Sequence, residues 1–324
     1  MDSQDYSETI DLAATADIAH SGKRLDQVAA ELFADYSRSR IKQWIDNGAL
    51  QVNGEARKPK DRLVGGEQLT LQATVEPAGE WQPEPMALNI AYEDDHLLVI
   101  NKPTNLVVHP AAGNYSGTLL NGLLHHCPSL ENVPRAGIVH RLDKDTTGLM
   151  VVAKTLAAHH NLVRQLQARS VKREYEAVVQ GTMTGGGTVE AAIGRHPRSR
   201  IKMAVVAHGG KEAITHYRLI HKFCDHTHIR LGLETGRTHQ IRVHMAHIGH
   251  PLVGDATYAG RMKLPKGAST ELVDMLRTGF KRQALHAASL ALVHPHIGDI
   301  MEWDAPLPAD FEHLLTVLAN NEAD

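Results

Sequence analysis

Cysteine is scarce in this sequence, which contains only Cys127 and Cys224. Two cysteines are too few for a disulfide framework or a cysteine zinc cage, and such scarcity is typical of a reducing compartment. The first residues carry acids where a signal peptide has a basic and then an apolar segment, and no apolar run is long enough to cross a bilayer. We therefore expect a soluble, cytoplasmic protein without membrane contact, in which both cysteines are buried free thiols.

Nucleotide-binding fingerprints are also missing. Lys211 follows two glycines in "HGGKEA", but the upstream glycine and the Ser or Thr of a P-loop are absent, and no G-x-G-x-x-G occurs. We therefore expect neither ATP nor NAD as a cofactor.

The 22 histidines raise the question of a metal site, most sharply in "THQIRVHMAHIGH", where His244, His247 and His250 recur every third residue. However, there is no H-E-x-x-H and no carboxylate among them, although Asp255 follows at a distance. A serine hydrolase is equally unsupported because G-x-S-x-G is absent. We expect no metal, and histidines that cap helix carbonyls or face RNA; a histidine-dependent metallohydrolase acting on RNA is the alternative.

The net charge is only −3, but the charged residues are distributed unevenly along the chain. Residues 1–20, 63–101 and 283–324 contain acids but no Lys or Arg, whereas residues 102–282 contain 25 Lys or Arg against 12 Asp or Glu. A basic middle suits a polyanion, because each neutralised phosphate releases condensed counterion. The plainer interpretation of any single cluster is solvated charge on a helix face.

Residues 21–75 have the pattern of a small RNA-binding module. "RLDQVAAELF" has helical apolar spacing, and a second amphipathic helix follows that Ser37 or Ser39 can cap and Gly48 can end. "ALQVNG" and "GGEQLTLQA" are expected to be strands bounded by glycine turns. This order resembles the alpha-L RNA-binding domain first described in a small-ribosomal-subunit protein. The basic side chains expected to sit together for RNA binding are Arg24, Arg38, Arg40 and Lys42.

The remaining chain is expected to form one larger domain. Residues 1–20 are interpreted as an acidic, disordered tail and residues 76–90, rich in proline and acids, as an extended linker. Residues 91–324 intersperse strands and helices without a regular βαβ repeat; Thr155, for example, can cap a helix that precedes the strand "REYEAVVQG". The fold class predicted is therefore α+β, with a mixed, largely antiparallel sheet.

Asp143 stands out in "GIVHRLDKDTTGLMVVAK", where it lies between two apolar runs. The plain interpretation is a turn residue, because "DKDTTG" is rich in turn formers. "LETGRTHQIRVH" offers a second compact site, in which Arg237 follows a strand and Thr238 can cap a helix whose N-terminus would attract an anion. Spacing alone does not show that Arg237 meets Asp143.

These stretches, with "REYEAVV", "LETGRTHQIRVHMAHIGHPLVGDATY" and "QALHA", resemble in content and order the motifs of the RluA/RluD-type pseudouridine synthases. The resemblance extends from about residue 21 to near the end of the chain and is strongest to the RluD type, which acts on large-subunit ribosomal RNA. It implies a pseudouridine synthase fold for the larger domain. It also implies isomerisation of uridine to pseudouridine without redox change or cofactor.

The resemblance also assigns roles to residues. It implies that Asp143 is the catalytic carboxylate, that Arg237 keeps it ionised through a forked contact, and that Tyr175 packs on the target ring and takes the proton from C5. The residues that it places against substrate are Leu285 under the base, Arg141 and His140 in the space the base leaves, and Thr238 and Gln240. From the residues alone, a core role is preferred for Tyr175 and Leu285, and His140 is equally well a satisfied core histidine.

The expected partner is large-subunit, 23S-type ribosomal RNA or a pre-50S particle, with the intersubunit-bridge stem-loop of domain IV as the implied target. Nothing in the sequence demands more than a monomer. Whether Asp143 adds to C1′, adds to C6 or removes a C2′ proton is not determined by the sequence. The rival from another class is a non-catalytic RNA-binding or ribosome-assembly factor, which would have no use for Asp143, Arg237 and Tyr175.

Overall fold

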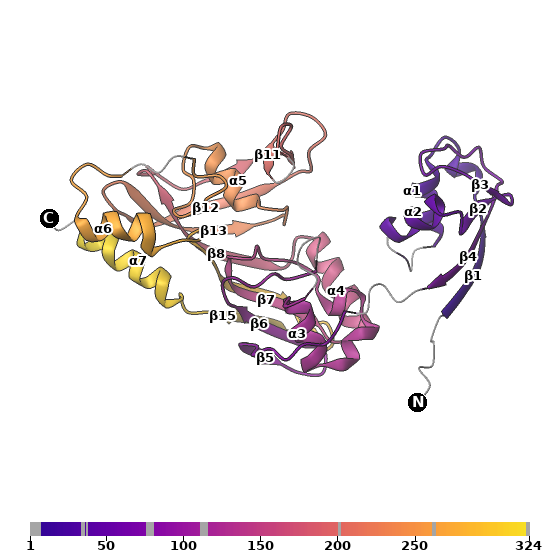
Figure 1. Cartoon of the computed structure of the whole chain (residues 1–324), viewed down its shortest axis with the longest axis horizontal. Helices are drawn as coiled ribbons and strands as arrows, with labels where there is room; N and C mark the ends of the chain where they lie inside the picture. Colours follow the sequence, from indigo (N-terminus) through magenta and orange to yellow (C-terminus); the bar gives the residue numbers. More distant parts are fainter. Residues whose placement is uncertain are drawn as a thin grey trace. The chain divides into compact units, whose positions relative to one another are not determined.

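The chain divides into two compact units, Met1–Glu80 and Trp81–Asp324. The computed structural model describes residues 8–33, 36, 38–75, 81–110, 116–199, 202–260 and 264–321. Each unit has its own sheet and its own hydrophobic core (Figure 1). Within these described ranges, no helix combines the length and the apolar character needed to span a bilayer.

The small unit is an antiparallel four-stranded sheet with two helices. The strand order is β1-β4-β2-β3. Its elements, in chain order, are β1 (Glu8–Thr15), the 3₁₀ turn η1 (Ile18–His20), α1 (Leu25–Leu32), α2 (Arg38–Asp46), β2 (Leu50–Val52), β3 (Glu55–Ala56) and β4 (Gln68–Val75). The two predicted helices, the strand that leads into the Asn-Gly turn (β2) and the strand that follows the Gly-Gly turn (β4) are confirmed.

The core of the small unit follows from helical spacing. Leu25 and Val28 of α1 and Ile41, Trp44 and Ile45 of α2 are all buried and pack on the inner face of the sheet. Helix α2 ends as predicted, since Gly48 has a φ of 79° and its N–H donates to the carbonyl of Ile45.

Of the two predicted caps for α2, Ser37 and the side chain of Ser39 lie outside the described part of the structure; the backbone of Ser39 lies within the helix.

Strand β1 corrects the prediction of a disordered tail over residues 1–20. Glu8 to Thr15 pair along their whole length with β4, while residues 1–7 lie outside the described part. The strand is held by backbone hydrogen bonds at the edge of the sheet, and its Leu12 remains 37% exposed. Because little apolar surface is buried there, the sequence carries no strong strand signal.

The large unit is built on a nine-stranded sheet. Its order is β5-β6-β7-β14-β8-β13-β12-β9, with β15 pairing on β14. Among the described pairings β7–β14 is parallel and the others are antiparallel, so the predicted α+β class with a mixed, largely antiparallel sheet is confirmed. The strands are β5 (Ile90–Glu93), β6 (Leu97–Lys102), β7 (Thr147–Ala153), β8 (Lys172–Gln180), β9 (Gly187–Glu190), β12 (Ile214–Lys222), β13 (His226–Leu233), β14 (Leu285–Val293) and β15 (Ile300–Asp304).

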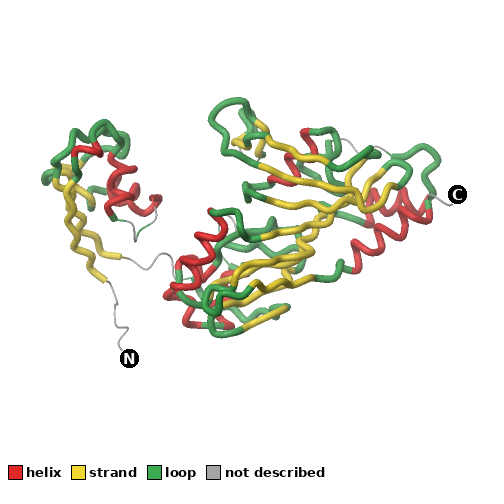
Figure 2. The backbone as a smooth tube through the Cα atoms, turned by 180° about the vertical axis from the view of Figure 1, so that it is seen from behind, coloured by secondary structure: helices red, strands yellow, loops and turns green. Residues whose placement is uncertain are grey.

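Helices cover this sheet at both ends, and strands run through the middle (Figure 2). A separate hairpin is formed by β10 (Ile193–Arg195) and β11 (Met203–Val205). The helices are α3 (Leu119–His126), α4 (Leu156–Gln167), α5 (Gln240–His247), α6 (Thr270–Asp274) and α7 (Ala309–Asn320), with short turns η2 (Pro128–Asn132), η3 (Pro134–Gly137) and η4 (Met275–Gly279). Thr155 caps α4 as predicted, because its hydroxyl accepts from the N–H of Ala158 at 3.1 Å.

Strands β6 and β7 are buried on both faces. Leu97 and Val99 of β6 pack with α4, whereas Leu98 and Ile100 face the core on the other side of the sheet. This two-sided burial explains why "LLVIN" and "GLMVVA" are continuous apolar runs rather than alternating ones. Asp143 precedes β7, so the buried strand fixes where the loop that carries Asp143 ends.

The segment predicted as a linker is partly integrated into the large unit. Residues 76–80 lie outside the described part, but Trp81 makes an edge contact with His109, and Met86 and Leu88 pack against the main core. The side chain of Asn121 also donates to the carbonyl of Gln82 at 2.9 Å. Residues 81–89 therefore form no helix or strand but belong to the larger unit.

The cysteines depart from expectation in their burial only. Cys127 is half-buried and Cys224 is exposed, so the expectation that both are buried was wrong, although both are free thiols. Cys224 lies in the turn between β12 and β13, where the chain reverses at the surface.

Gly148 offers a test of how closely the strands approach. It has a φ of 111° and is paired with Ala287 of β14, whose backbone would overlap a Cβ at this position. We expect Gly148→Ala to lower the free energy of unfolding by about 2 kcal/mol or more, from overpacking and backbone strain. Urea unfolding measures this, and the control is Gly232→Ala in β13, where a Cβ meets nothing within 4 Å. Equal unfolding midpoints for both variants would contradict the close approach.

Candidate active site

Asp143 lies in the loop that joins η3 to β7. Its side chain is 16% exposed, and its backbone carbonyl accepts from the N–H of Thr146 at 3.0 Å, which is the turn predicted from "DKDTTG". The turn and the functional interpretations of Asp143 are therefore compatible, because a main-chain turn leaves its carboxylate directed elsewhere.

Lys102, the last residue of β6, holds this loop through its buried side chain. Its side chain is fully buried, and its ammonium donates to the carbonyls of Pro103, Leu106 and Lys144 at 2.7, 3.0 and 2.9 Å. Burial lowers the pKa of Lys102 to about 8, against the opposing charges of Asp145 and Asp143. One of these three charge-assisted hydrogen bonds thus ties Lys144, the residue after Asp143, to the end of β6.

The carboxylate of Asp143 is paired with Arg242 of α5. Nη1 of Arg242 lies 2.8 Å from Oδ2 of Asp143, while its Nε and Nη2 contact both oxygens of Asp255 at 2.7 and 2.9 Å. Asp255 is buried and also accepts from the N–H groups of Thr257 and Tyr258. The forked contact of Nε and Nη2 with Asp255 thus directs the third nitrogen of the guanidinium, Nη1, at Asp143.

The protonation states follow from this pairing. Burial opposes the charge on Arg242, but its hydrogen bonds to Asp255 and Asp143 outweigh burial and raise the pKa of the guanidinium. For Asp255 burial favours the neutral acid, but Arg242 and two backbone N–H groups overcome it and lower the pKa. Arg242 is therefore a permanent cation, and Asp143 faces it directly.

The prediction that Arg237 pairs with the carboxylate of Asp143 was wrong. Nε of Arg237 donates to the carbonyl of Glu212 at 2.9 Å, and its backbone N–H donates to Oε1 of Gln240 at 3.0 Å. Both arginines belong to the "GRTHQIR" stretch, and Arg242 is the one whose place in α5 directs it at Asp143. Arg237 still lines the same cleft.

The start of α5 also differs from expectation. The helix begins at Gln240, and the flanking residue is His239, so Thr238 is not the cap that was predicted. Oε1 of Gln240 accepts from the hydroxyl of Thr235 at 2.8 Å, and its Nε2 donates to the carbonyl of Ile214 at 3.0 Å. Gln240 was expected to contact substrate, but its buried amide is already satisfied by the protein and instead fixes the loop in front of α5.

Tyr175 and Leu285 come from neighbouring strands of the central sheet. They lie in β8 and β14, are 5% and 4% exposed, and both face the cleft that contains Asp143. Burial raises the pKa of Tyr175, to which the charge of Asp143 adds, so its phenol is protonated at neutral pH. Both side chains belong to the main core as well as to the cleft.

Arg141 and His140, beside Asp143, have different surroundings. Arg141 is exposed at the cleft and suits a contact with RNA. In contrast, Nε2 of His140 accepts from the N–H of Val151 at 3.0 Å, and burial, with the charge of Arg173, lowers the pKa of His140 to about 3. His140 is therefore a neutral histidine engaged with β7, which agrees with the core alternative for this residue.

The cleft itself has a volume of about 840 Å³. A cavity of this size accommodates a nucleoside with room for neighbouring backbone. It brings together all eight residues of the large unit that were singled out from the sequence, namely Asp143, Tyr175, Arg237, Arg141, His140, Leu285, Thr238 and Gln240. Arg135, Arg169 and Arg173 add positive charge to its lining, as a phosphate-bearing ligand requires.

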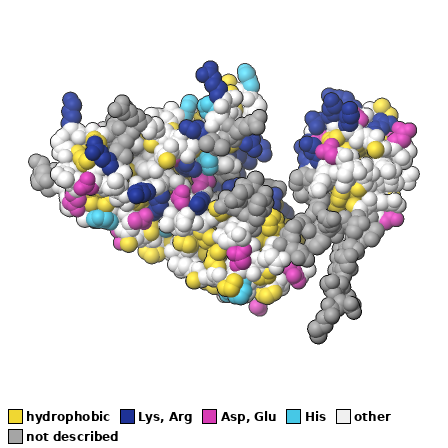
Figure 3. Space-filling view, in the orientation of Figure 1, with side chains coloured by type: hydrophobic (Ala, Val, Ile, Leu, Met, Phe, Trp, Pro, Cys, Tyr) yellow, Lys and Arg dark blue, Asp and Glu magenta, His cyan; other side chains and the backbone are white. Residues whose placement is uncertain are grey.

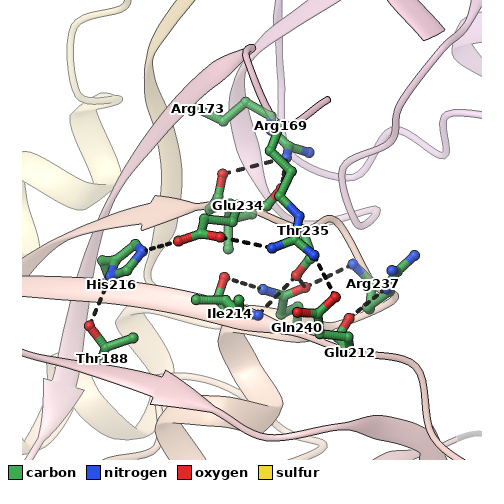
Figure 4. A network of polar contacts seen from close by, with 11 residues as sticks. Arg169, Arg173, Thr188, Glu212, Ile214, His216, Glu234, Thr235, Arg237 and Gln240 are labelled. Atoms are coloured by element: carbon green, nitrogen blue, oxygen red, sulfur yellow. Dashed lines mark hydrogen bonds and ion pairs between the residues drawn. The ribbon is translucent and has the colours of Figure 1, made fainter. Parts of the chain in front are cut away.

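A network of polar contacts ties the two sides of the cleft together (Figure 4). Arg169, which follows α4, contacts the carboxylates of both Glu212 and Glu234. Oε1 of Glu234 also contacts Nε2 of His216 at 2.7 Å, and Arg173 donates to the carbonyl of Glu234 at 3.3 Å. The helical side of the cleft is thus connected to the ends of β12 and β13.

The histidines considered as metal ligands have other partners. Nδ1 of His244 contacts the hydroxyl of Thr215 at 2.9 Å and its Nε2 the carbonyl of Ala191, while Nδ1 of His250 contacts the carbonyl of Gln180. Among the residues that the structure describes, no group of three or more His, Cys, Asp or Glu side chains is arranged to hold a metal ion.

The four basic residues predicted to bind RNA lie in or beside α1 and α2. Arg24 and Arg38 both contact the buried Asp26 at 2.9 Å, yet their side chains remain 45% and 55% exposed, and Lys42 is exposed. The side chain of Arg40 lies outside the described part. Lys and Arg side chains gather at one end of this unit (Figure 3), which suits a phosphate backbone.

Comparison with known families agrees with both units. Residues 96–247 match the RNA pseudouridylate synthase family, and residues 23–69 match the S4 domain. The fold and the site thus define an RNA pseudouridine synthase, an isomerase with an S4-type RNA-binding domain.

Curated relatives are similar over nearly the whole chain. Ribosomal large subunit pseudouridine synthase D of Pseudomonas aeruginosa is 59% identical, with 96% of this chain and 97% of the relative covered. The enzyme of the same name from Escherichia coli K12 is 56% identical, with 96% and 95% covered. The chain therefore belongs to the pseudouridine synthase family, which confirms the resemblance drawn from its motifs.

A solved structure supports the fold of the large unit. Human RNA Pseudouridylate Synthase Domain Containing 4 is 27% identical and has a TM-score of 0.57, with 71% of this chain and 93% of that chain covered.

Sequence reasoning missed Lys102, Arg242, Asp255 and the pair His239 and Tyr258. Arg242 carried a usable signal, because it is the second arginine of a motif already singled out and lies two residues after the start of a helix. Asp255 was noticed only as a distant carboxylate. Its pairing with Arg242 depends on how the chain after α5 turns back, which no local pattern shows.

The two arginines give a direct test of the pairing. We expect Arg242→Gln to lower turnover of uridine-containing RNA by at least about 100-fold, because Asp143 and Asp255 both lose their cation, whereas Arg237→Gln should cost less than about tenfold. Single-turnover assays of pseudouridine formation measure this. Urea unfolding of both variants, together with Arg242→Lys, which keeps the charge without the fork, separates turnover from folding. A larger loss in Arg237→Gln than in Arg242→Gln would restore the pairing first predicted.

Proposed function

We propose that this enzyme converts specific uridines of large-subunit ribosomal RNA to pseudouridine, with Asp143 as the catalytic carboxylate. The relatives that bear the name ribosomal large subunit pseudouridine synthase D support the choice of substrate. The observation that carries the catalytic assignment is the carboxylate of Asp143, held by Arg242 in a cleft that also contains Tyr175 and Leu285.

The reaction is an isomerisation that needs no outside reagent. The bond between C1′ of the ribose and N1 of uracil breaks, the base turns, and a bond forms between C1′ and C5. The proton lost from C5 is balanced by one gained at N1. Asp143 serves this sequence by adding to C1′, by adding to C6, or by removing a proton from C2′, and each route needs an ionised carboxylate beside the nucleoside.

The roles that we propose for the other cleft residues follow from the need to extrude the base from the RNA. A uracil inside an RNA fold must leave its stack, which costs a few kcal/mol. Leu285 provides an apolar surface under the ring and Tyr175 an aromatic one beside it, with a protonated phenol whose oxygen can accept hydrogen bonds. We assign to Arg141, which is exposed at the cleft, stacking or hydrogen bonding in the space that the base leaves.

Within large-subunit RNA, we propose the intersubunit-bridge stem-loop of domain IV as the target, as the resemblance to the RluD type implies. We propose that the protein acts as a monomer on the RNA or on a pre-50S particle. Mapping pseudouridines in ribosomal RNA from a strain lacking the gene, with and without the gene restored, tests the target. Restoration at other positions only would contradict it.

Asp143→Asn tests the chemistry, because the change is nearly isosteric and removes the charge. We expect pseudouridine formation to fall by at least roughly 10³-fold, while RNA binding changes little. Release of tritium from 5-tritiated uridine in RNA measures turnover, and filter binding measures affinity. Asp145→Asn, two residues along the same loop, is the control and should retain activity. Robust turnover by Asp143→Asn would defeat the catalytic assignment and return the chain to the RNA-binding alternative.

The S4-type unit gives a separate prediction on binding. Arg38 and Lys42 lie one helical turn apart on α2, and replacing both with Gln should weaken binding to ribosomal RNA while leaving turnover of a short RNA unchanged. The slope of log affinity against log salt should become shallower by about 1.5, as expected for two lost phosphate contacts. Asp46→Asn in the same helix is the control and should not weaken binding. An unchanged slope in the double variant would show that α2 does not contact phosphate.

A further inference from the structure

His239 stands beside Asp143 on the side that Arg242 does not occupy. Nε2 of His239 lies 3.8 Å from Oδ1 of Asp143, whereas Nη1 of Arg242 contacts Oδ2. The residue has a φ of 58° and a ψ of 22°, which is a left-handed conformation that few residues other than glycine adopt. His239 therefore does not continue helix α5 backwards, and its ring lines the cleft.

The other ring nitrogen of His239 is held by Tyr258. Nδ1 lies 2.7 Å from the hydroxyl of Tyr258, and this hydroxyl also accepts from the backbone N–H of Met203 in β11 at 2.9 Å. A tyrosine hydroxyl has a single proton to donate. Since the N–H of Met203 can only donate, the tyrosine proton is free for Nδ1, and the arrangement satisfies every group when Nδ1 is the acceptor.

The tautomer of His239 follows from this accounting. If Nδ1 accepts from Tyr258, the proton of a neutral imidazole is on Nε2 and faces Oδ1 of Asp143. The opposite tautomer would direct a lone pair of Nε2 at a carboxylate oxygen and leave the hydroxyl of Tyr258 without an acceptor. Burial lowers the pKa of His239 despite the charge of Asp143, so the ring is neutral at neutral pH.

Tyr258 also contacts the other partner of Asp143. The guanidinium carbon of Arg242 lies 5.0 Å from the centroid of the Tyr258 ring, within the range of a cation–π contact. One aromatic side chain thus supports Arg242 with its ring and His239 with its hydroxyl, and these two residues face opposite oxygens of the same carboxylate.

We propose that His239 is a positioning residue for Asp143, whose neutral ring, in the tautomer fixed by Tyr258, directs its Nε2–H at Oδ1 across 3.8 Å. Arg242 holds Oδ2 and supplies the charge, while the N–H dipole of His239, which is too far from Oδ1 for a direct hydrogen bond, favours one orientation of the carboxylate without adding a second charge that would quench it. The oxygen that meets the nucleoside is thereby kept in one orientation. This inference rests on the catalytic role proposed for Asp143.

The first experiment reads the tautomer directly. With histidine ring nitrogens labelled with ¹⁵N, the signals of His239 are those missing from His239→Gln. We expect a protonated Nε2 and an unprotonated Nδ1 in the native enzyme at neutral pH, and a mixture of tautomers in Tyr258→Phe. A protonated Nδ1 in the native enzyme would overturn the proposal whatever the activities are.

The second experiment measures turnover with saturating RNA. Tyr258→Phe keeps the ring beneath Arg242 and removes only the hydroxyl that contacts the neutral ring of His239. We therefore expect kcat to fall by about tenfold while KM changes little, which is the upper end of the range for one lost neutral hydrogen bond. The kcat of His239→Ala should fall at least as far. The kcat of His239→Gln, whose amide can direct an N–H at Asp143, should lie between that of His239→Ala and the native value. Native kcat in Tyr258→Phe would contradict the proposal.

Two controls separate this proposal from the proposed function. Tyr92→Phe removes a hydroxyl that lies outside the cleft and contacts Asp94 at a distance of 2.8 Å. His247→Gln changes an exposed histidine of α5. Both variants should keep the native kcat. If Asp143→Asn is active, the catalytic assignment fails. If Asp143→Asn is inactive but Tyr258→Phe is fully active, only the role of His239 fails.

Discussion

The contact between Arg242 and Asp143 is the interaction on which the site depends, and it exists because Asp255 holds the opposite edge of the same guanidinium. A lone carboxylate in a half-buried cleft would tend to take up a proton, and a lone buried arginine would be costly. The three groups stabilise one another, since each acid lies within hydrogen-bond distance of a permanent cation. Helix α5, the turn that carries Asp255 and the loop before β7 must all be in place for this arrangement.

The surrounding fold is organised to fix those three segments. Lys102 ties the loop of Asp143 to the end of β6, and Gln240 ties the start of α5 to the edge of β12. The central strands β8 and β14 place Tyr175 and Leu285 next to each other without any loop being involved. Apolar surface against the base thus comes from rigid strands, and polar groups come from loops that buried hydrogen bonds immobilise.

Much of this was predictable from the sequence, for identifiable reasons. Helical and strand periodicity predicted α1, α2 and β8, and motif resemblance identified the family and the residues that share the cleft. The partner of Asp143 was assigned to the wrong arginine of the "GRTHQIR" stretch, because the sequence did not show that α5 begins at Gln240, where a buried network fixes its start. Strand β1 was missed because backbone pairing with β4, rather than apolar burial, holds it.

The segment from Trp81 to Leu88 has a consequence for how such enzymes can be rearranged. Because these residues pack into the larger core, the usable splice point between the modules lies before Trp81 and not at the first strand of the large sheet. A chimaera that exchanges the RNA-binding module but cuts at residue 90 would strip the core of Trp81, Met86 and Leu88 and expose the face that they cover. The boundary between the two modules therefore lies several residues before β5, the first strand of the large sheet.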